Sequence, residues 1–423
     1  MTDMPSVQFV TIDPAHFHAA LVHKQMLPGV DRCVHVYAPP GPDVEMHLQR
    51  MQAFAGRSDN PTHWDVRATV APDFMQRFLH EKPGNVVVLA GRNRTKIDTM
   101  LQCVEAGYHV LADKPWIIRR EDFPKVERLL ALAAEKQRIV FDMMTERFEI
   151  TSILQREIVR NRMLFGTIRP GAGEQPAVRM ESVHALKKMV SGQPLRRPVS
   201  FFNIHEQGDA LADVGTHLVD LVQWIISPDE PVRVSDVDIV HCERWPTKIT
   251  PQDFEAITGS TALPGFLDRD AEGNLLYPGN NRIVYRLRGV PVELITRWDV
   301  VCPEGDTHFA TFIGPKATIE ICQAGGPPQV FLRAGESKRT PDVSFVLRKF
   351  PGVKLVPDGK EFRFVIPDAL RTGHEAHFQE VTAQFLQHLE SSTRLPEWEV
   401  SGLLAKYWTT AAAGPGRQAD TEK

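Results

Sequence analysis

Residues 86–116 read VVVLAGRNRTKIDTMLQCVEAGYHVLADKPW, and this stretch decides the fold of the chain. The β-branched run at its start predicts a buried strand, and an amphipathic helix is expected over 97–106. Gly107 has the position of the glycine that commonly ends a helix, and Tyr108, Val110 and Leu111 predict a second buried strand. A strand, a helix and a second strand of this kind predict a βαβ unit of a parallel sheet.

The second of these strands is closed by Asp113, Lys114 and Pro115. Pro115 has no N–H to donate and biases Lys114 toward an extended conformation, so the strand ends at the carboxyl edge of the sheet. Open α/β sheets bind their ligands at this edge. Lys114 is therefore a candidate for chemistry, and the alternative is a surface lysine in an ordinary strand-to-loop junction.

The order of strands and helices predicts two domains. Short strands alternate with helices over residues 7–142, which predicts a doubly wound parallel sheet with a boundary near Thr145. A helix is expected over 150–162, and the later strands predict an α+β domain with a largely antiparallel sheet. The predicted domains are residues 1–145 and 146–423. Strands of the second domain are expected over 231–239, 281–288, 291–299, 310–313 and 317–321, with loops over 266–280 and 325–341.

The composition argues against several classes of protein. The 49 Lys and Arg residues are outnumbered by 53 Asp and Glu, and no basic run is interleaved with aromatic residues, so no nucleic-acid partner is expected. No apolar stretch reaches the roughly 20 residues that span a membrane, and Met1 to Pro5 lack the features of a secretion signal, so a cytoplasmic location is expected. The five cysteines form no C-x-x-C pair, so reduced thiols without structural zinc are expected.

The turn after the first strand has the sequence DPAHFH over residues 13–18 and contains no glycine. The spacing suits Asp13 as a helix N-cap and Pro14 as the first helical residue. The N–H groups of Ala15 to Phe17 would then be available to a phosphate at the helix N-terminus. His16 and His18 either add donors there or serve as packing and capping residues.

The second strand, Cys33 to Ala38, carries no acid at its end to hold an adenosine ribose. A proline-rich turn follows Ala38 instead. Arg50 lies too far along the chain to be assigned to a 2′-phosphate. The sequence therefore does not distinguish NAD from NADP.

His205, Asp209, Asp213 and His217 follow one another at intervals of four residues. A continuous helix would place all four on one stripe. One interpretation is a divalent metal site, but Gly208 and Gly215 are expected to break the helix and spread the ligands, so no metal is predicted. Another is a set of solvated or structural polar residues.

Together these segments resemble the Gfo/Idh/MocA family of oxidoreductases. The strand, the Asn-bearing turn, the glycine junction and the E-K-P motif of that family match residues 86–116 in order, with Asp113 in place of glutamate. Residues 208–225 are similar to its D-x-G-x-H-x-x-D helix, and residues 377–413 to its C-terminal helix pair. The match is weakest between about Thr247 and Gly373. The chain departs from the family at residues 13–18, where the family carries G-x-G-x-x-G.

This resemblance implies a hydride transfer between NAD or NADP and a hydroxyl or keto carbon of a sugar, glycoside or inositol. It implies that Lys114 contacts the reacting hydroxyl, that His217 exchanges its proton, and that Asp213 orients His217 or shares its role. It also implies a homo-oligomer, a dimer or tetramer, formed through the open face of the second sheet. The residues expected at the cofactor are Asp13, Ala15, His16, Phe17, His18, Ala38, Ala90, Arg92, Asn93, Asp113, Lys114 and Pro115. Those expected at the substrate are Lys114, Arg147, His205, Asp213 and His217.

Four further residues have two interpretations each. Arg147 matches an arginine of the family's substrate cleft, and a structural salt bridge is the alternative. Trp116 and Trp298 either stack on a sugar face or belong to the core. Asp220 is expected to support the helix rather than to act in catalysis.

Two other functions stay open. A glycoside hydrolase or lyase of this architecture would oxidise a sugar carbon transiently and return the hydride to a retained NAD. A nucleotide- or sugar-binding regulator would keep the fold without turnover, as the missing glycines allow. Lys114, Asp213 and His217 together argue against the regulator, because a pure binding protein needs no acid/base pair beside a lysine.

Overall fold

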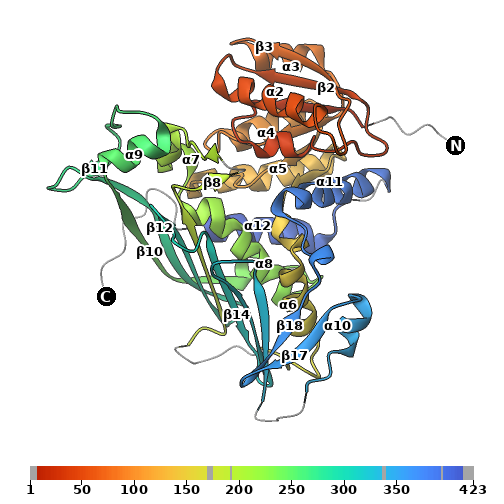
Figure 1. Cartoon of the computed structure of the whole chain (residues 1–423). Helices are drawn as coiled ribbons and strands as arrows, with labels where there is room; N and C mark the ends of the chain where they lie inside the picture. The colour runs from red at the N-terminus through yellow and green to blue at the C-terminus, as the bar shows by residue number, and fades with distance from the viewer. Residues whose placement is uncertain (1–6, 169–174, 191–192, 336–339, 392–393, 413–423) are drawn as a thin grey trace. The chain divides into compact units, whose positions relative to one another are not determined.

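The computed structural model describes residues 7–168, 175–190, 193–335, 340–391 and 394–412 (Figure 1). These residues form two compact units. Unit 1 comprises the described parts of Met1–Ile117, Glu121–Phe148 and Gly373–Pro396, and unit 2 comprises those of Ile118–Arg120, Glu149–Thr372 and Glu397–Lys423. The predicted fold class is confirmed, with a doubly wound parallel sheet in unit 1 and a mixed, mostly antiparallel sheet in unit 2.

Unit 1 is built on a six-stranded parallel sheet in the order β3-β2-β1-β4-β5-β6. Strands β1 and β4 are buried along their whole length, as is typical of a parallel sheet covered on both faces. The strands are β1 (Phe9–Ile12), β2 (Cys33–Ala38), β3 (Asp65–Val70), β4 (Val86–Leu89), β5 (His109–Ala112) and β6 (Val140–Asp142). The helices are α1 (His18–Leu21), α2 (Pro42–Ala55), α3 (Phe74–Glu81), α4 (Lys96–Glu105), α5 (Phe123–Glu135) and α11 (His374–Glu390), with the 3₁₀ turns η1 (Arg120–Asp122) and η2 (Thr145–Phe148).

Helix α11 belongs to unit 1, although it lies more than two hundred residues beyond the rest of that unit. The expected division had placed everything after Thr145 in the second domain. Phe378 and Phe385 of α11 are buried in the same core as Phe9 of β1 and Leu111 of β5. The apolar face of this helix, rather than its place in the chain, therefore decides which unit it joins.

Unit 2 contains a ten-stranded sheet in which β7 and β13 pair in parallel and the other neighbours are antiparallel. The strand order is β10-β12-β13-β7-β14-β15-β16-β18-β17, with β11 paired to β12. Its strands are β7 (Val178–Ala185), β10 (Val237–Ile249), β11 (Asp268–Arg269), β12 (Leu275–Leu287), β13 (Val290–Asp299), β14 (Thr307–Ile313), β15 (Ala317–Gln323), β16 (Gln329–Ala334), β17 (Lys354–Asp358) and β18 (Glu361–Val365), and β8 (Met189–Val190) and β9 (Gln193–Pro194) form a separate pair. The helices are α6 (Ile150–Arg160), α7 (Ile204–Gln207), α8 (Thr216–Ile226), α9 (Pro251–Thr258), α10 (Ser344–Lys349) and α12 (Glu397–Ala411), with the short turns η3 (Val199–Phe202), η4 (Leu211–Gly215), η5 (Val234–Asp236) and η6 (Asp368–Leu370).

Three predicted boundaries in unit 2 are wrong. The expected loop over 266–280 contains β11 and the start of β12, because Leu275 and Tyr277 are buried on one face of a strand. The described part of the expected loop over 325–341 contains β16, where Val330 and Leu332 alternate into the core. Glycine, proline and polar residues around both strands hid this short alternation. The strand expected from Pro231 begins only at Val237, after the turn η5.

The described residues include five free cysteines. Cys103 of α4 is fully buried. Burial raises the pKa of its thiol, so Cys103 is a packing residue rather than a nucleophile. Every helix in the described parts of the chain is too short or too polar to cross a membrane.

A buried ion pair joins α8 to α12 inside unit 2. Lys406 Nζ donates to Asp220 Oδ1 at 2.9 Å, and the two side chains are 1% and 3% exposed. A buried charge is costly unless a partner compensates it. Asp220 is therefore a structural residue of the helix pair, as expected.

Replacing Lys406 by methionine is expected to lower the free energy of unfolding by about 3–5 kcal/mol, because it leaves the Asp220 carboxylate buried and uncompensated. The double variant K406M/D220L is expected to regain most of this loss. Urea unfolding followed by circular dichroism measures both variants. The control is Lys349→Met, which removes the more exposed Lys349–Glu157 pair and is expected to cost about 0–1 kcal/mol. Equal losses in K406M and K349M would contradict the assignment.

Candidate functional site

The sheet of unit 1 has a topological switch point between β1 and β4. From β1 the chain proceeds to β2 and β3 on one side, and it then crosses to β4, β5 and β6 on the other. In sheets of this order, ligands bind beyond the carboxyl ends of the two central strands. The residues that follow β1, β4 and β5 are therefore the candidate site in unit 1.

The turn after β1 differs from its expected form. Helix α1 begins only at His18, with Phe17 as its N-cap, so the assignment of Asp13 as N-cap and Pro14 as first helical residue is wrong. Asp13 instead has a positive φ of 44°. The Ala15 N–H donates to Asp13 O at 2.8 Å, and the His16 N–H donates to Ala90 O at 3.0 Å. Two of the N–H groups expected to receive a phosphate are thus already bonded within the protein.

The glycine that this region requires lies after β4 rather than after β1. Gly91 has φ of 128°, and a Cβ built on it would lie 2.6 Å from the Ala15 Cβ. No side chain fits at such a distance, so only glycine allows the two turns to approach this closely. The turn after β1 therefore packs its backbone against the turn after β4.

Arg92 joins three segments at the carboxyl edge of the sheet. Its Nε lies 2.6 Å from Asp13 Oδ2, and its Nη2 lies 3.1 Å from Asp43 Oδ2 of α2. Burial raises the pKa of Asp13, and the Arg92 guanidinium opposes this change. Arg92 is about half exposed, so its guanidinium still faces solvent.

His16 of the turn after β1 and His18 of α1 lie near Asp113, the acid that follows β5. His18 Nδ1 lies 2.9 Å from Asp113 Oδ2, and His16 Nδ1 lies 3.8 Å from the same oxygen. Burial lowers the pKa of His18, and the Asp113 carboxylate opposes this change. Burial alone would raise the pKa of Asp113, but neighbouring His18, Lys114 and Lys96 hold it below its usual range. The structure thus brings together His16, His18 and Asp113, which are far apart in the sequence.

Lys96 of α4 supports the loop that carries Lys114, and the sequence had not indicated it. Its ammonium donates to Asn93 Oδ1 at 2.8 Å, Asp113 O at 2.9 Å and Pro115 O at 3.0 Å. Lys96 is only 3% exposed. The amide of Asn93, expected at the cofactor, has its oxygen engaged by this lysine. A lysine at the first position of a helix carries no signal in the sequence that distinguishes it from a surface residue.

Replacing Lys96 by methionine is expected to lower the free energy of unfolding by about 2–4 kcal/mol, because it leaves buried carbonyl oxygens without their donor. Urea unfolding monitored by circular dichroism measures this loss. Lys136→Met is the matched control, since Lys136 pairs with an exposed Glu105 at 3.5 Å. A K96M protein as stable as K136M would show that Lys96 does not hold the loop.

The other residues of unit 1 that the sequence singled out lie in different environments. Lys114 is 8% exposed, and its peptide bond to Pro115 is cis. The Ala38 carbonyl accepts from the Ala71 N–H at 3.0 Å. The Phe17 ring is 5.9 Å from the Arg50 guanidinium. Trp116 is fully buried, which supports its core interpretation.

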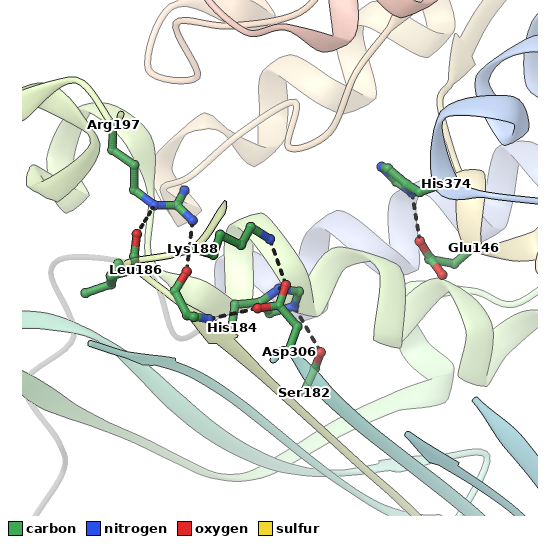
Figure 2. A network of polar contacts seen from close by, with 9 residues as sticks. Glu146, Ser182, His184, Leu186, Lys188, Arg197, Asp306 and His374 are labelled. Carbon is green, nitrogen blue, oxygen red and sulfur yellow. Dashed lines mark hydrogen bonds and ion pairs between the residues drawn. The ribbon is translucent and has the colours of Figure 1, made fainter. Parts of the chain in front are cut away.

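The η2 turn carries Glu146 and Arg147 at the start of the segment that follows β6. Glu146 Oε1 lies 3.3 Å from His374 Nδ1 of α11, as Figure 2 shows. The His374 ring is also 5.6 Å from the His18 ring. Arg147 is partly buried in η2. The Glu146–His374 pair thus connects η2 with α11, and the sequence pattern had not singled out His374.

In unit 2, His205, Asp209, Asp213 and His217 do not form one helical stripe. Gly208 has φ of 90° and ends α7, as expected. Asp209 is 2% exposed and accepts from Arg244 Nη2 at 2.7 Å and from Asn281 Nδ2 at 3.0 Å. Asp209 is therefore a structural residue, and His205 lies on the other side of the break.

Asp213 and His217 do share a helical face. Asp213 lies in η4, a π-helical segment that continues directly into α8, where His217 lies. The expectation that Gly215 breaks the helix is wrong, because its φ is −63°. A Cβ on Gly215 would lie 2.5 Å from a Leu211 methyl group, so this glycine allows close packing inside the helix. Asp213 and His217 are both partly buried.

A polar network that the sequence analysis missed lies at the end of β7 (Figure 2). His184 Nδ1 is 3.0 Å from Asp306 Oδ2, and His184 Nε2 is 3.1 Å from Ser182 Oγ. Lys188 donates to the same carboxylate at 2.8 Å. Burial alone would raise the pKa of Asp306, but its hydrogen bonds to His184 and Lys188 hold that pKa below the usual range. Asp306 lies 122 residues beyond His184, so no local pattern reveals the pair.

Arg197 lies near this network and near Asp213. Its guanidinium donates to Leu186 O at 3.3 Å and Ala185 O at 3.2 Å (Figure 2). It also stacks on the Trp298 ring at 4.8 Å. Burial lowers the pKa of Arg197, and the Asp213 carboxylate opposes this change. Trp298 is 4% exposed, so it belongs to the core of unit 2.

The chain is similar to a protein family and to a solved structure that are both described as oxidoreductases. The family model described as "Putative oxidoreductase C terminal domain" matches residues 154–415. The crystal structure of a putative oxidoreductase from Parabacteroides merdae ATCC 43184 is 40% identical, covers 96% of each chain and superposes with a TM-score of 0.91. No curated protein matches this chain.

More distant solved structures share the fold. KijD10, a 3-ketoreductase from Actinomadura kijaniata in complex with NADP, is 14% identical, covers 96% of each chain and has a TM-score of 0.56. GenD2 from gentamicin A biosynthesis, in complex with NAD, is 16% identical, covers 99% of this chain and 97% of its own, and has a TM-score of 0.56. Identities this low show a common fold and no more.

Proposed function

Because this chain belongs to the family of the putative oxidoreductase C-terminal domain, we propose that it transfers a hydride between NAD or NADP and a carbon of a carbohydrate. The carbon carries a hydroxyl or keto group of a sugar, a glycoside or an inositol. The observation that carries the proposal is the position of Lys114, directly after β5 beside the switch point of a doubly wound sheet. The finer assignment to the Gfo/Idh/MocA family is part of this proposal.

The residues at the switch point fit a dinucleotide whose phosphates are held differently from the usual pattern. The N–H groups of Ala15 and His16 are already used, and the turn has no glycine of its own. The guanidinium of Arg92, half exposed although it is paired with Asp13 and Asp43, is a cation at this edge that would meet a phosphate. When bound, NAD or NADP accepts or supplies the hydride. The end of β2 does not distinguish NAD from NADP, because Ala38 occupies the place of the usual acid.

In the proposed reaction, the protein's own residues accept a proton from the substrate and stabilise the negative charge that develops on its oxygen. Lys114 contacts the substrate oxygen and stabilises the alkoxide that forms as its proton leaves. His217 accepts that proton, and Asp213, one helical turn earlier, orients the imidazole or shares the proton. Support comes from the common helical face of Asp213 and His217 and from the burial of Lys114. A homo-oligomer and a cytoplasmic location stay predictions from the sequence.

Mass spectrometry of the small molecules released on denaturation tests this function. Recovery of NAD(H) or NADP(H) at about one per chain is the expected result, and it would name the cofactor. Net reduction of added cofactor with a panel of sugars and inositols then separates an oxidoreductase from a hydrolase or lyase that recycles its NAD. The absence of any released cofactor, together with no binding of either one in calorimetric titration, would refute the proposal in favour of a regulator.

A further inference from the structure

His16, His18 and Asp113 of unit 1 form a compact group of metal-binding side chains. Each offers one ligand atom, and these atoms all lie within 4.8 Å of one another. His16 lies in the turn after β1, His18 is the first residue of α1, and Asp113 directly follows β5. The group therefore rests on two strands of one sheet, in a single unit of the protein.

The distances in this group suit a transition metal after small side-chain rotations. Ligands at about 2.0–2.2 Å from a zinc ion are separated from each other by roughly 3–3.5 Å. The observed separations from Asp113 Oδ2 are 2.9 Å to His18 Nδ1 and 3.8 Å to His16 Nδ1, on either side of that range. The longer separation belongs to His16, the more exposed of the two histidines, whose Nδ1 also accepts from the His18 N–H at 3.5 Å.

The burial of the group points independently to a bound cation. Asp113 is 3% exposed and His18 is 6% exposed. Asp113 Oδ1 is a buried oxygen that accepts no hydrogen bond from the described residues. A buried carboxylate oxygen without a partner is costly, and a metal ion that both oxygens approach removes that cost.

The same carboxylate argues against an anion at this position. A phosphate beside Asp113 would meet a like charge in a buried environment. Two imidazoles and one carboxylate instead match the ligand preferences of zinc and other first-row divalent ions rather than those of magnesium or calcium. Lys114 and Lys96 add positive charge nearby, which predicts weaker binding than at a structural zinc site of four ligands.

We propose that His16, His18 and Asp113 bind one divalent first-row transition metal ion, with Zn²⁺ as the reference ligand. Three protein ligands leave a coordination position for water or for a substrate oxygen. The sequence predicted no metal at the four residues around Asp213 and no structural zinc at the cysteines, and its local patterns do not connect His16 and His18 with Asp113. The proposed metal site does not depend on the proposed redox function, because it rests on the ligand atoms of these three side chains and not on a bound cofactor.

The test uses the full chain after treatment with EDTA and removal of the chelator. Titration with Zn²⁺ by calorimetry, and with Co²⁺ by visible absorption, is expected to saturate at one ion per chain. The d–d absorption of Co²⁺ reports its coordination geometry without any measurement of activity. NAD(P) binding is measured on the same samples, so failure of the metal site and failure of the redox proposal are separate results.

Three variants locate the ion. His16→Ala and Asp113→Asn are expected to weaken Zn²⁺ binding by at least about tenfold. His184→Ala is the matched control, because it removes one partner of a His–Asp pair of similar length, 3.0 Å, in unit 2. Circular dichroism confirms that each variant is folded, and His16→Ala carries the test if Asp113→Asn is not. Absence of stoichiometric binding in the natural sequence, or equal affinity in H16A and H184A, would overturn the proposal.

Discussion

Replacing Lys114 by methionine is expected to reduce kcat by about 10²–10³-fold while the protein remains folded. Methionine is unbranched and of similar length, so it fills the buried space while it removes the charge and the N–H donors of the ammonium. Without the ammonium, the alkoxide that forms as the hydroxyl proton leaves has no compensating cation during hydride transfer, so the loss falls on kcat rather than on cofactor binding. Steady-state kinetics with the substrate found in the sugar panel, and calorimetry with the cofactor, measure the two effects.

Lys136→Met is the control for this variant, because it removes a surface lysine of unit 1. Its kcat is expected to equal that of the natural sequence. A K114M protein with unchanged turnover would exclude Lys114 from the chemistry. A regulator, in contrast to an enzyme, would lose at most some affinity for its ligand.

Replacing His217 by alanine is expected to lower kcat/KM by about 10²–10⁴-fold, the usual contribution of a general acid or base. A base acts only when it is deprotonated, so the rate of substrate oxidation by the natural sequence should fall as the pH falls. The variant is expected to lose this pH dependence along with its activity. A pH profile of kcat/KM for both proteins measures the change, which a purely structural role of His217 would not produce.

Two neighbouring substitutions sharpen this test. Asp213→Asn keeps the size of the side chain and is expected to reduce kcat/KM by a smaller factor, since Asp213 orients or assists the base. His205→Ala compares the other histidine that the sequence placed at the substrate, because His205 is exposed and is separated from this helix by the break at Gly208. Its activity is expected to stay within a few-fold of the natural value. A larger loss in H205A than in H217A would transfer the proposed role to His205.

The sequence predicted the parts of the fold that depend on local patterns. The apolar runs of β4 and β5, the helix between them and Gly107 predicted a βαβ unit, which the structure contains over 86–112. Gly107 has φ of 98°, as a helix-ending glycine requires. Such elements are legible because hydrophobic periodicity and backbone conformation involve residues close together in the chain.

The candidate site was predicted only in part, because motifs indicate residue types and not their partners. Lys114 was found from the proline that follows it and from its place after a strand. The turn after β1 was misread, since the bond from His16 N–H to Ala90 O and the contact of Ala15 with Gly91 involve two separate turns. Asp209 belonged to the same spacing pattern as Asp213, yet Arg244 and Asn281 make it structural.

By itself, the sequence determined the doubly wound sheet, the separate α+β unit and the position of Lys114 at the end of β5. Only the tertiary structure decided that α11 joins unit 1, that Lys96 holds the Lys114 loop, and that His16 and His18 meet Asp113. The physical reason is the range of the interactions. Strand and helix patterns arise from neighbours in the chain, whereas a buried charge selects its partner by position in the folded core, whatever their separation in sequence.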